Sequence, residues 1–159
     1  MIPEPPEGWN KRRWAGIVRR VSQLASQHRQ LAKQRGETLF YGKRELLTMV
    51  VMYPNCPYCG EPLRGSNLSL DHRTPLARGG TMDLENYDAT CRRCNKRKGQ
   101  LTADEYRAIL EVIKDWPLDA RRDVLMRLAA GSGMLRMLRA KAGQTGELHG
   151  KARREALGV

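Results

Sequence analysis

The fold is decided by the stretch CPYCGEPLRGSNLSLDHRTPLARGGTMDLENYDATCRRCNKRKG, residues 56–99. It begins with one C-x-x-C pair, Cys56 and Cys59, and closes with a second, Cys91 and Cys94, and these are all the cysteines of the chain. Two such pairs predict one tetrahedral zinc ion held by four thiolates. Because a closed four-sulfur site leaves no open coordination position, we expect this zinc to be structural. Two disulfides and a redox site are disfavoured, since no secretory signal is visible and a redox site needs only one pair.

Short elements are expected between the cysteine pairs. Residues 68–73 and 87–90 have the composition of strands, and the Gly-containing segment 77–86 is expected to be a loop. A short helix should start at residue 91 or 92 and run to about Lys98, ending at Gly99. The predicted unit is therefore two strands followed by a helix.

Asp71 and His72 lie side by side in the first predicted strand. Neighbouring residues of a regular strand point to opposite faces, so this pair can share a site only at a strand end or a bulge. Pro75 favours a strand end. On the following helix, Asn95 is turned by about 100° from Cys94. Asn95 can therefore leave the zinc side and face the strand that carries Asp71.

The flanking segments are expected to be helical. Apolar residues recur at steps of three and four between Asn10 and Arg35, while basic residues occupy another face, which is a candidate phosphate contact. His28 belongs to the apolar stripe, so we expect it to be packed rather than catalytic. The remaining expectations are an irregular arm (1–8), helices over 43–51, 102–116, 117–131 and 134–142, a hinge-like break at 131–133, and a basic tail. We predict an α+β protein with three parts: residues 1–53, 54–101 and 102–159.

Charge is high and unevenly distributed along the chain. The formal net charge is +12, and residues 8–55 hold ten Lys or Arg against two acidic residues. This asymmetry indicates a nucleic-acid partner; a merely well-solvated surface is the alternative. No apolar run approaches the roughly 18 residues of a membrane span. Without a membrane or secretory segment, we expect a cytoplasmic protein.

The stretch CPYCG…LSLDHRTPLARGGTMDLENYDATCRRCNKRKGQ resembles the HNH endonuclease family, in the version whose third histidine is asparagine. The features that carry the resemblance are the cysteine frame, the Asp-His dipeptide, the Gly-Gly loop, a central Asn and the CN-x-x-KG ending. The resemblance covers about residues 54–100 and implies a ββ-α metal (His-Me finger) core. It also implies hydrolysis of DNA to 5′-phosphate and 3′-hydroxyl ends.

The resemblance further implies a role for four residues. His72 would be the general base and Asn86 would orient it, while Asp71 and Asn95 would hold a catalytic Mg²⁺ or Mn²⁺ through oxygen atoms. Basic residues around this site are candidate contacts to the phosphates of double-stranded DNA, with a solvated face as the alternative. These residues are Arg73, Arg78, Arg92, Arg93, Lys96, Arg97 and Lys98. By spacing, Lys98 lies on the cysteine side of the helix.

We therefore predict a zinc-stabilised DNA endonuclease, either a nickase or a double-strand cutter. Phage DNA processing, intron homing and restriction are all served by small proteins of this type. The alternative is a non-catalytic zinc module that binds DNA or RNA through basic helices. A structural zinc protein within a larger machine is a third possibility. The joint presence of Asp71, His72 and Asn95 favours the enzyme, because a pure binding module does not need all three.

Overall fold

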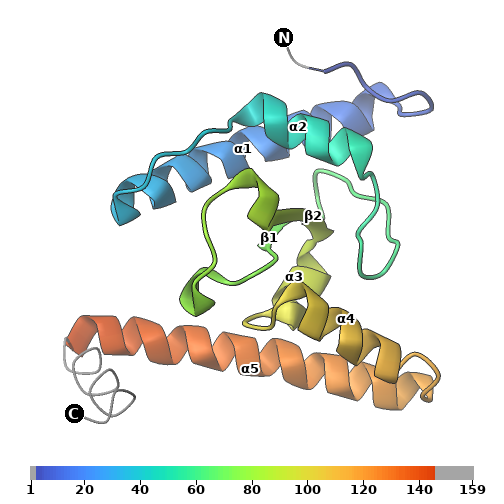
Figure 1. The fold of residues 1–159 in the computed structure, drawn as a ribbon. Helices are drawn as coiled ribbons and strands as arrows, with labels where there is room; N and C mark the ends of the chain where they lie inside the picture. The colour runs from blue at the N-terminus through green and yellow to red at the C-terminus, as the bar shows by residue number, and fades with distance from the viewer. Residues whose placement is uncertain (1–2, 146–159) are drawn as a thin grey trace.

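The computed structural model describes residues 3–145, and side chains as far as residue 131. It confirms the α+β class: one two-stranded sheet is surrounded by helices (Figure 1). The helices are α1 (Lys11–Arg35), α2 (Lys43–Met52), α3 (Arg92–Lys98), α4 (Ala103–Val112) and α5 (Leu118–Thr145). The strands are β1 (Leu68–His72) and β2 (Tyr87–Cys91), and two 3-10 turns, Leu76–Arg78 and Leu84–Asn86, lie in the loop between them. The arm that precedes α1 is irregular over the described residues 3–10.

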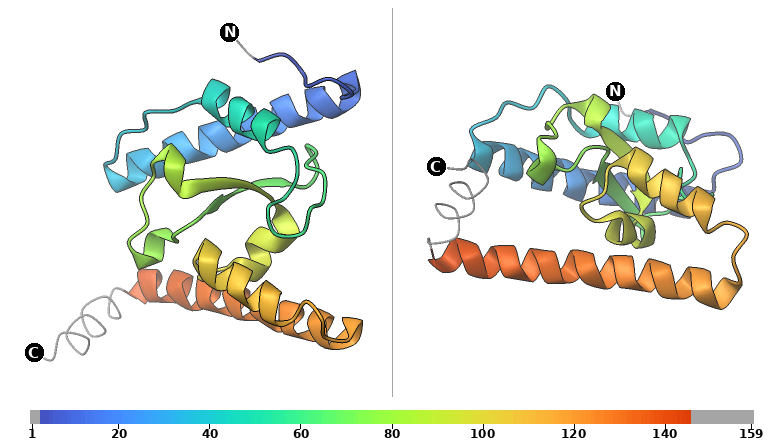
Figure 2. Two further views of the ribbon diagram at one scale, coloured as in Figure 1. Left: turned by 45° about the vertical axis from the view of Figure 1, so that its right-hand side comes forward. Right: turned by 60° about the horizontal axis from the view of Figure 1, so that its bottom comes forward.

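The sheet lies at the centre of the molecule. Strands β1 and β2 are antiparallel, and their register pairs Leu68 with Cys91 and His72 with Tyr87. Helices α1 and α2 cover one side of the sheet, while α4 and α5 lie on the other side, beyond α3 (Figure 2). The zinc unit predicted from the cysteines is thus held between two helical layers.

Helix α1 follows the expected pattern closely. The side chain of Asn10 accepts a hydrogen bond of 2.8 Å from the backbone N–H of Arg13, which caps the helix start. Gly36 ends the helix in the left-handed conformation with φ of 71°. The buried stripe of α1 joins α2, the sheet and α4 in one core, which includes Ile17, Val21, Leu24, Leu46, Leu47, Val50, Leu70, Tyr87 and Tyr106. The boundaries predicted at residues 53 and 101 stay a prediction.

The C-terminal helices differ from expectation in two ways. Helix α4 ends at Val112 rather than at Trp116, and the chain turns before Pro117, which disfavours helical backbone in the residue that precedes it. The break expected at residues 131–133 is wrong, because α5 runs through them without interruption. A glycine inside a helix costs only about 1 kcal/mol, and Gly131 does not take the positive φ that ends a helix. The predicted basic tail lies outside the described residues.

None of the described helices combines the length and the apolar character that crossing a membrane requires.

Candidate active site and zinc site

The four cysteine sulfurs lie together at one end of the sheet. They are all within 4.8 Å of one another, and the Sγ atoms of Cys59 and Cys91 are 3.8 Å apart. A tetrahedral site with Zn–S bonds of about 2.3 Å requires sulfur–sulfur distances of roughly 3.8 Å. Three of the four cysteines are buried. The clustering expected from the sequence is confirmed, and this group can hold a metal such as zinc.

The cysteine cluster fixes where α3 begins. Cys91 is the last residue of β2, and its Sγ accepts a hydrogen bond of 3.4 Å from the backbone N–H of Cys94 in the first turn of α3. The turn between Cys56 and Cys59 closes through a 2.9 Å hydrogen bond from Gly60 N to Cys56 O. A metal bound here would tie β2 and α3 to the chain segment that precedes β1.

A cavity of about 330 Å³ brings three of the predicted site residues together. Asp71, His72 and Asn95 all line it, together with Leu70, Pro75, Leu76, Ala77, Lys98, Gly99 and Gln100. His72 is the last residue of β1, as the strand-end argument required. Because β1 ends there, Asp71 and His72 can both contribute to one cavity.

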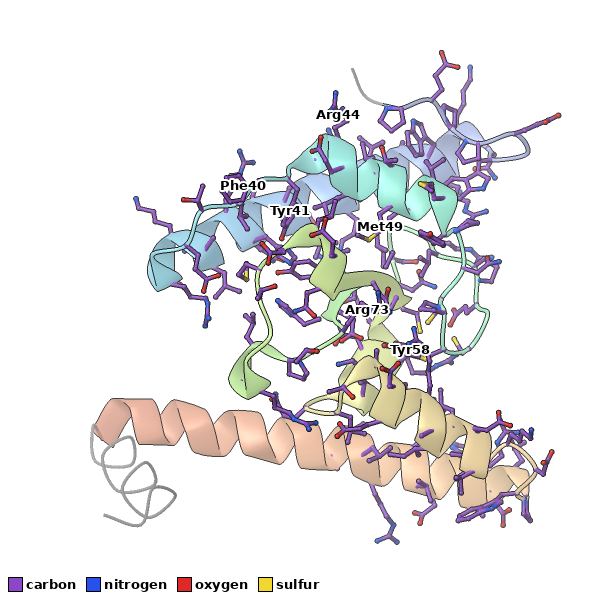
Figure 3. The ribbon with its side chains drawn as sticks, in the orientation of Figure 1. Phe40, Tyr41, Arg44, Met49, Tyr58 and Arg73 are labelled. Carbon is purple, nitrogen blue, oxygen red and sulfur yellow. The ribbon has the colours of Figure 1, made fainter. Side chains whose placement is uncertain are left out.

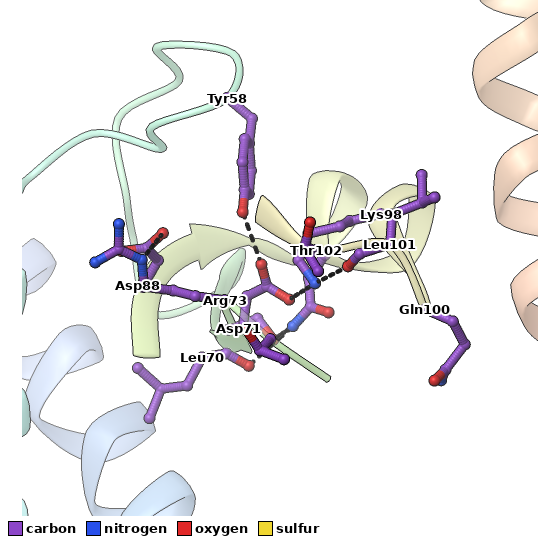
Figure 4. A network of polar contacts seen from close by, with 12 residues as sticks. Tyr58, Leu70, Asp71, Arg73, Asp88, Lys98, Gln100, Leu101 and Thr102 are labelled. Atoms are coloured by element: carbon purple, nitrogen blue, oxygen red, sulfur yellow. Dashed lines mark hydrogen bonds and ion pairs between the residues drawn. The ribbon is translucent and has the colours of Figure 1, made fainter. Parts of the chain in front are cut away.

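Both carboxylate oxygens of Asp71 have partners within the protein (Figure 4). The hydroxyl of Tyr58 donates to Oδ2 at 2.9 Å, and the ammonium of Lys98 lies 3.1 Å from Oδ1. Burial raises the pKa of Asp71 to about 6, and the charge of Lys98 opposes that shift. Asp71 is therefore an ionised, buried carboxylate at neutral pH, and a carboxylate can accept more bonds than these two.

The sequence predicted neither of these two contacts of Asp71. Tyr58 lies inside the first cysteine pair, where the sequence gives no signal that its hydroxyl reaches the site. Lys98 was expected among the DNA-contacting residues, but it is only 1% exposed. That expectation is corrected, because Lys98 faces inward on the cysteine side of α3 and its ammonium also donates to Leu101 O at 2.7 Å. The spacing argument had placed it on that side correctly.

The amide of Asn95 is held in one orientation. Its Nδ2 donates to Ser69 Oγ at 2.8 Å and to Leu70 O at 2.9 Å. Both bonds attach α3 to β1, and among the described residues no hydrogen bond occupies the amide oxygen, which can therefore act as an acceptor. Asp71 and Asn95 thus supply a carboxylate and an amide oxygen, a donor set that fits a hard divalent cation such as Mg²⁺ or Mn²⁺.

His72 packs within an aromatic cluster. Its ring centroid is 4.4 Å from that of Tyr87 and 6.3 Å from that of His28, to which it is stacked. His28 is buried, as expected, and its Nδ1 lies 2.8 Å from the hydroxyl of Tyr41, which belongs to the segment joining α1 to α2 (Figure 3). Sequence analysis missed this contact between His28 and His72, because no local pattern relates the two positions.

The surroundings keep the imidazole of His72 neutral. Burial lowers its pKa to about 4, and electrostatic interactions with His28, Lys98 and Arg35 act in the same direction. The Nε2 atom is buried and has no hydrogen-bond partner among the described residues. A neutral imidazole with an unused ring nitrogen can accept a proton.

The side chain of Asn86 forms hydrogen bonds with the backbone of the loop that follows His72. Its Oδ1 accepts from Thr74 N at 2.9 Å, and its Nδ2 donates to Thr74 O at 3.0 Å and to Thr81 O at 2.9 Å. We had expected the side chain to orient His72 directly, but these three hydrogen bonds go to loop backbone. Any influence on His72 therefore passes through the chain that leaves β1.

The expected DNA-contacting residues divide into two groups. Arg92, Lys96 and Arg97 on α3 have no acidic partner among the described residues, and the first two are exposed. Three others already face carboxylates: Arg93 lies 3.0 Å from Glu61, Arg73 3.9 Å from Asp88, and Arg78 binds both oxygens of Glu105.

Comparisons with known proteins agree with this geometry. The family model described as HNH endonuclease matches residues 56–101. A stretch of 45 residues of the chain is 49% identical to the CRISPR-associated endonuclease Cas9 of Corynebacterium diphtheriae. That alignment covers 28% of this chain and 4% of the Cas9 protein. The family match covers the zinc unit and its cavity, and the chain spans only a small part of the length of this relative.

Proposed function

Since residues 56–101 belong to the HNH endonuclease family, we propose that this protein is a metal-dependent endonuclease that hydrolyses phosphodiester bonds of double-stranded DNA. The observation that carries the proposal is the cavity in which His72, Asp71 and Asn95 converge. His72, whose Nε2 has no hydrogen-bond partner among the described residues, lines this cavity together with Asp71 of β1 and Asn95 of α3. Such a convergence is the geometry that phosphodiester hydrolysis needs.

His72 is the proposed general base. Its imidazole is uncharged at neutral pH, and the rings of Tyr87 and His28 that pack against it restrict its movement. A neutral imidazole can take the proton from an attacking water molecule. The bonds of Asn86 to Thr74 and Thr81 hold the adjoining loop, so Asn86 positions His72 indirectly.

Asp71 and Asn95 are the proposed ligands of a catalytic Mg²⁺ or Mn²⁺. When bound, the ion would polarise the scissile phosphate and offset the charge on the leaving 3′ oxygen, giving 5′-phosphate and 3′-hydroxyl products. Asn95 is oriented for this role by its bonds to Ser69 and Leu70. The role of the four cysteines is separate, since a zinc ion there would have no open position for substrate.

DNA is supported as the substrate by the charge of the chain. The net charge is +12, and Arg92 and Lys96 are exposed on the helix that carries Asn95. Phosphate contacts of this kind orient a duplex without reading its sequence. The proposal therefore includes no target sequence.

The test is cleavage of supercoiled plasmid by the purified zinc-loaded protein, with and without Mg²⁺ or Mn²⁺. We expect metal-dependent nicking or linearisation by wild type, and a loss of at least about 100-fold in His72→Ala and in Asn95→Ala. Zinc content and thermal unfolding of each variant are measured alongside, so that misfolding is recognised. Full activity of the His72→Ala variant would show that His72 is not part of the catalytic site. Tight DNA binding by a wild type that cuts under no metal condition would instead indicate the non-catalytic zinc module.

A further inference from the structure

A second cavity, larger than the one at His72, lies between the N-terminal half of α1 and the turn that precedes β1. Its volume is about 890 Å³. We call it the arginine groove, and its lining consists of Gly8, Asn10, Arg12, Arg13, Gly16, Arg19, Arg20, Gln23, Arg64, Gly65 and Ser66. Eight of these eleven residues precede residues 56–101, so the family match does not cover most of the groove.

The positive charge of the arginine groove is uncompensated. Five arginines line it, and its described lining contains no Asp or Glu. Among the described side chains, none of the five forms an ion pair. Burial and the neighbouring charge of Arg64 both lower the pKa of Arg13, and burial and Arg92 do the same for Arg20. Like charges held together in this way favour binding of a polyanion.

The floor of the groove is fixed by the fold. Arg13 donates through Nε and Nη2 to Leu63 O at 3.2 and 3.0 Å, and its guanidinium stacks on the ring of Trp9 at 3.8 Å. Arg20 donates to Leu68 O at 3.1 Å. These bonds attach α1 to the segment around β1, so the groove is built into the structure.

A close approach of two glycines sets the width of the groove. A Cβ added to Gly65 would overlap the backbone of Gly16, so only a glycine lets the turn approach α1 this closely. Arg12 and Arg19 on α1 and Arg64 on the turn are exposed at the rim, and no hydrogen bond of their guanidinium groups is recorded among the described residues. The rim arginines are therefore available to an external ligand.

Helix α1 connects the arginine groove to the proposed active site. Gly16 lines the groove, and His28, twelve residues later on the same helix, stacks on His72. At 1.5 Å per residue the two points are roughly 18 Å apart. This distance corresponds to about five base pairs of duplex at 3.4 Å each.

We propose that the arginine groove binds the phosphate backbone of duplex DNA about five base pairs away from the bond that is cut. The inference rests on the proposed function in taking DNA as the ligand. Guanidinium groups suit phosphate because they can donate two parallel hydrogen bonds to it. Contacts of this type fix the position of the duplex and carry no base specificity.

The test measures binding in a His72→Ala background, where the proposed cleavage cannot interfere. A labelled duplex of about 24 base pairs, roughly two helical turns, is titrated at several salt concentrations by fluorescence anisotropy. The test variant is Arg12→Gln/Arg19→Gln, which leaves the bonds of Arg13 and Arg20 intact. The matched control is Arg29→Gln/Arg122→Gln, which loses the same charge from exposed positions outside the groove.

We expect the slope of log K against log salt to become shallower by roughly 1.8 in the test variant, since each phosphate contact contributes about 0.9. The slope of the control should stay close to that of the His72→Ala parent protein. Arg64→Gln, which changes the opposite rim, should make this slope shallower by about half as much as the test variant does. Equal slopes in the test variant and the control would overturn the inference. A plasmid-cutting assay of the wild type decides the proposed function separately.

Discussion

The ammonium of Lys98 lies 3.1 Å from Oδ1 of Asp71, and the two side chains are only 1% and 3% exposed. This buried ion pair connects α3 to β1 inside the proposed active site. We expect Lys98→Met to destabilise the protein by about 3–5 kcal/mol, because it leaves an unpaired carboxylate in a buried position. Urea unfolding at neutral pH and constant zinc concentration measures the effect.

Two further variants separate the ion pair from the packing around it. Asp71→Asn/Lys98→Met removes both charges, so it should recover most of the stability lost in Lys98→Met. Lys96→Met, on the exposed face of the same helix, should stay within about 0.5 kcal/mol of wild type. If Lys98→Met is as stable as Lys96→Met, the pair contributes little to the fold.

Removal of zinc should unfold the sheet and α3. Apparent binding free energies of structural zinc reach about 10 kcal/mol or more, and the four sulfurs hold together segments separated by 31 residues of sequence. We expect a chelator to lower the melting temperature sharply and added zinc to restore it. Circular dichroism during thermal unfolding is the measurement. An unchanged melting temperature in protein shown to be zinc-free would contradict a structural role.

The sequence predicted well the helices and strands whose boundaries are determined by neighbouring residues. The helix expected over residues 10–35 is α1 (Lys11–Arg35), and the strand expected over 68–73 is β1 (Leu68–His72). Caps and apolar spacing determine these boundaries. The uninterrupted α5 was missed, because a Gly-Ser-Gly sequence weakens a helix without deciding whether the surrounding structure maintains it.

The sequence names the residues of the proposed site, but it does not predict the contacts that they make. Cysteine spacing and the family resemblance identify Asp71, His72 and Asn95, and the structure places all three on one cavity. Neither source identifies Tyr58 as a partner of Asp71, or His28 as a neighbour of His72. Such contacts depend on how distant segments pack against each other, which no short sequence window records.

Asn86→Ala should lower the cleavage rate by about 10- to 100-fold. The change removes three hydrogen bonds that hold Thr74 and Thr81, and so loosens the loop that adjoins His72. Single-turnover cleavage measures the rate. Asn86→Asp is the control, because it keeps the acceptor for Thr74 N and loses the two donated bonds, so we expect an intermediate rate. A wild-type rate in Asn86→Ala would show that the loop does not position His72.

Gly65→Ala should destabilise the protein by about 1–3 kcal/mol and weaken DNA binding as well. The added Cβ overlaps the backbone of Gly16, so α1 must move away from the turn that forms the arginine groove. Gly131→Ala is the matched control, since among the described residues no atom beyond its neighbours and its own helix backbone lies within 4 Å of the added Cβ, and its helical backbone favours alanine by about 1 kcal/mol. Urea unfolding and duplex binding are measured on both variants. If the two behave alike, the contact between Gly16 and Gly65 does not set the position of α1.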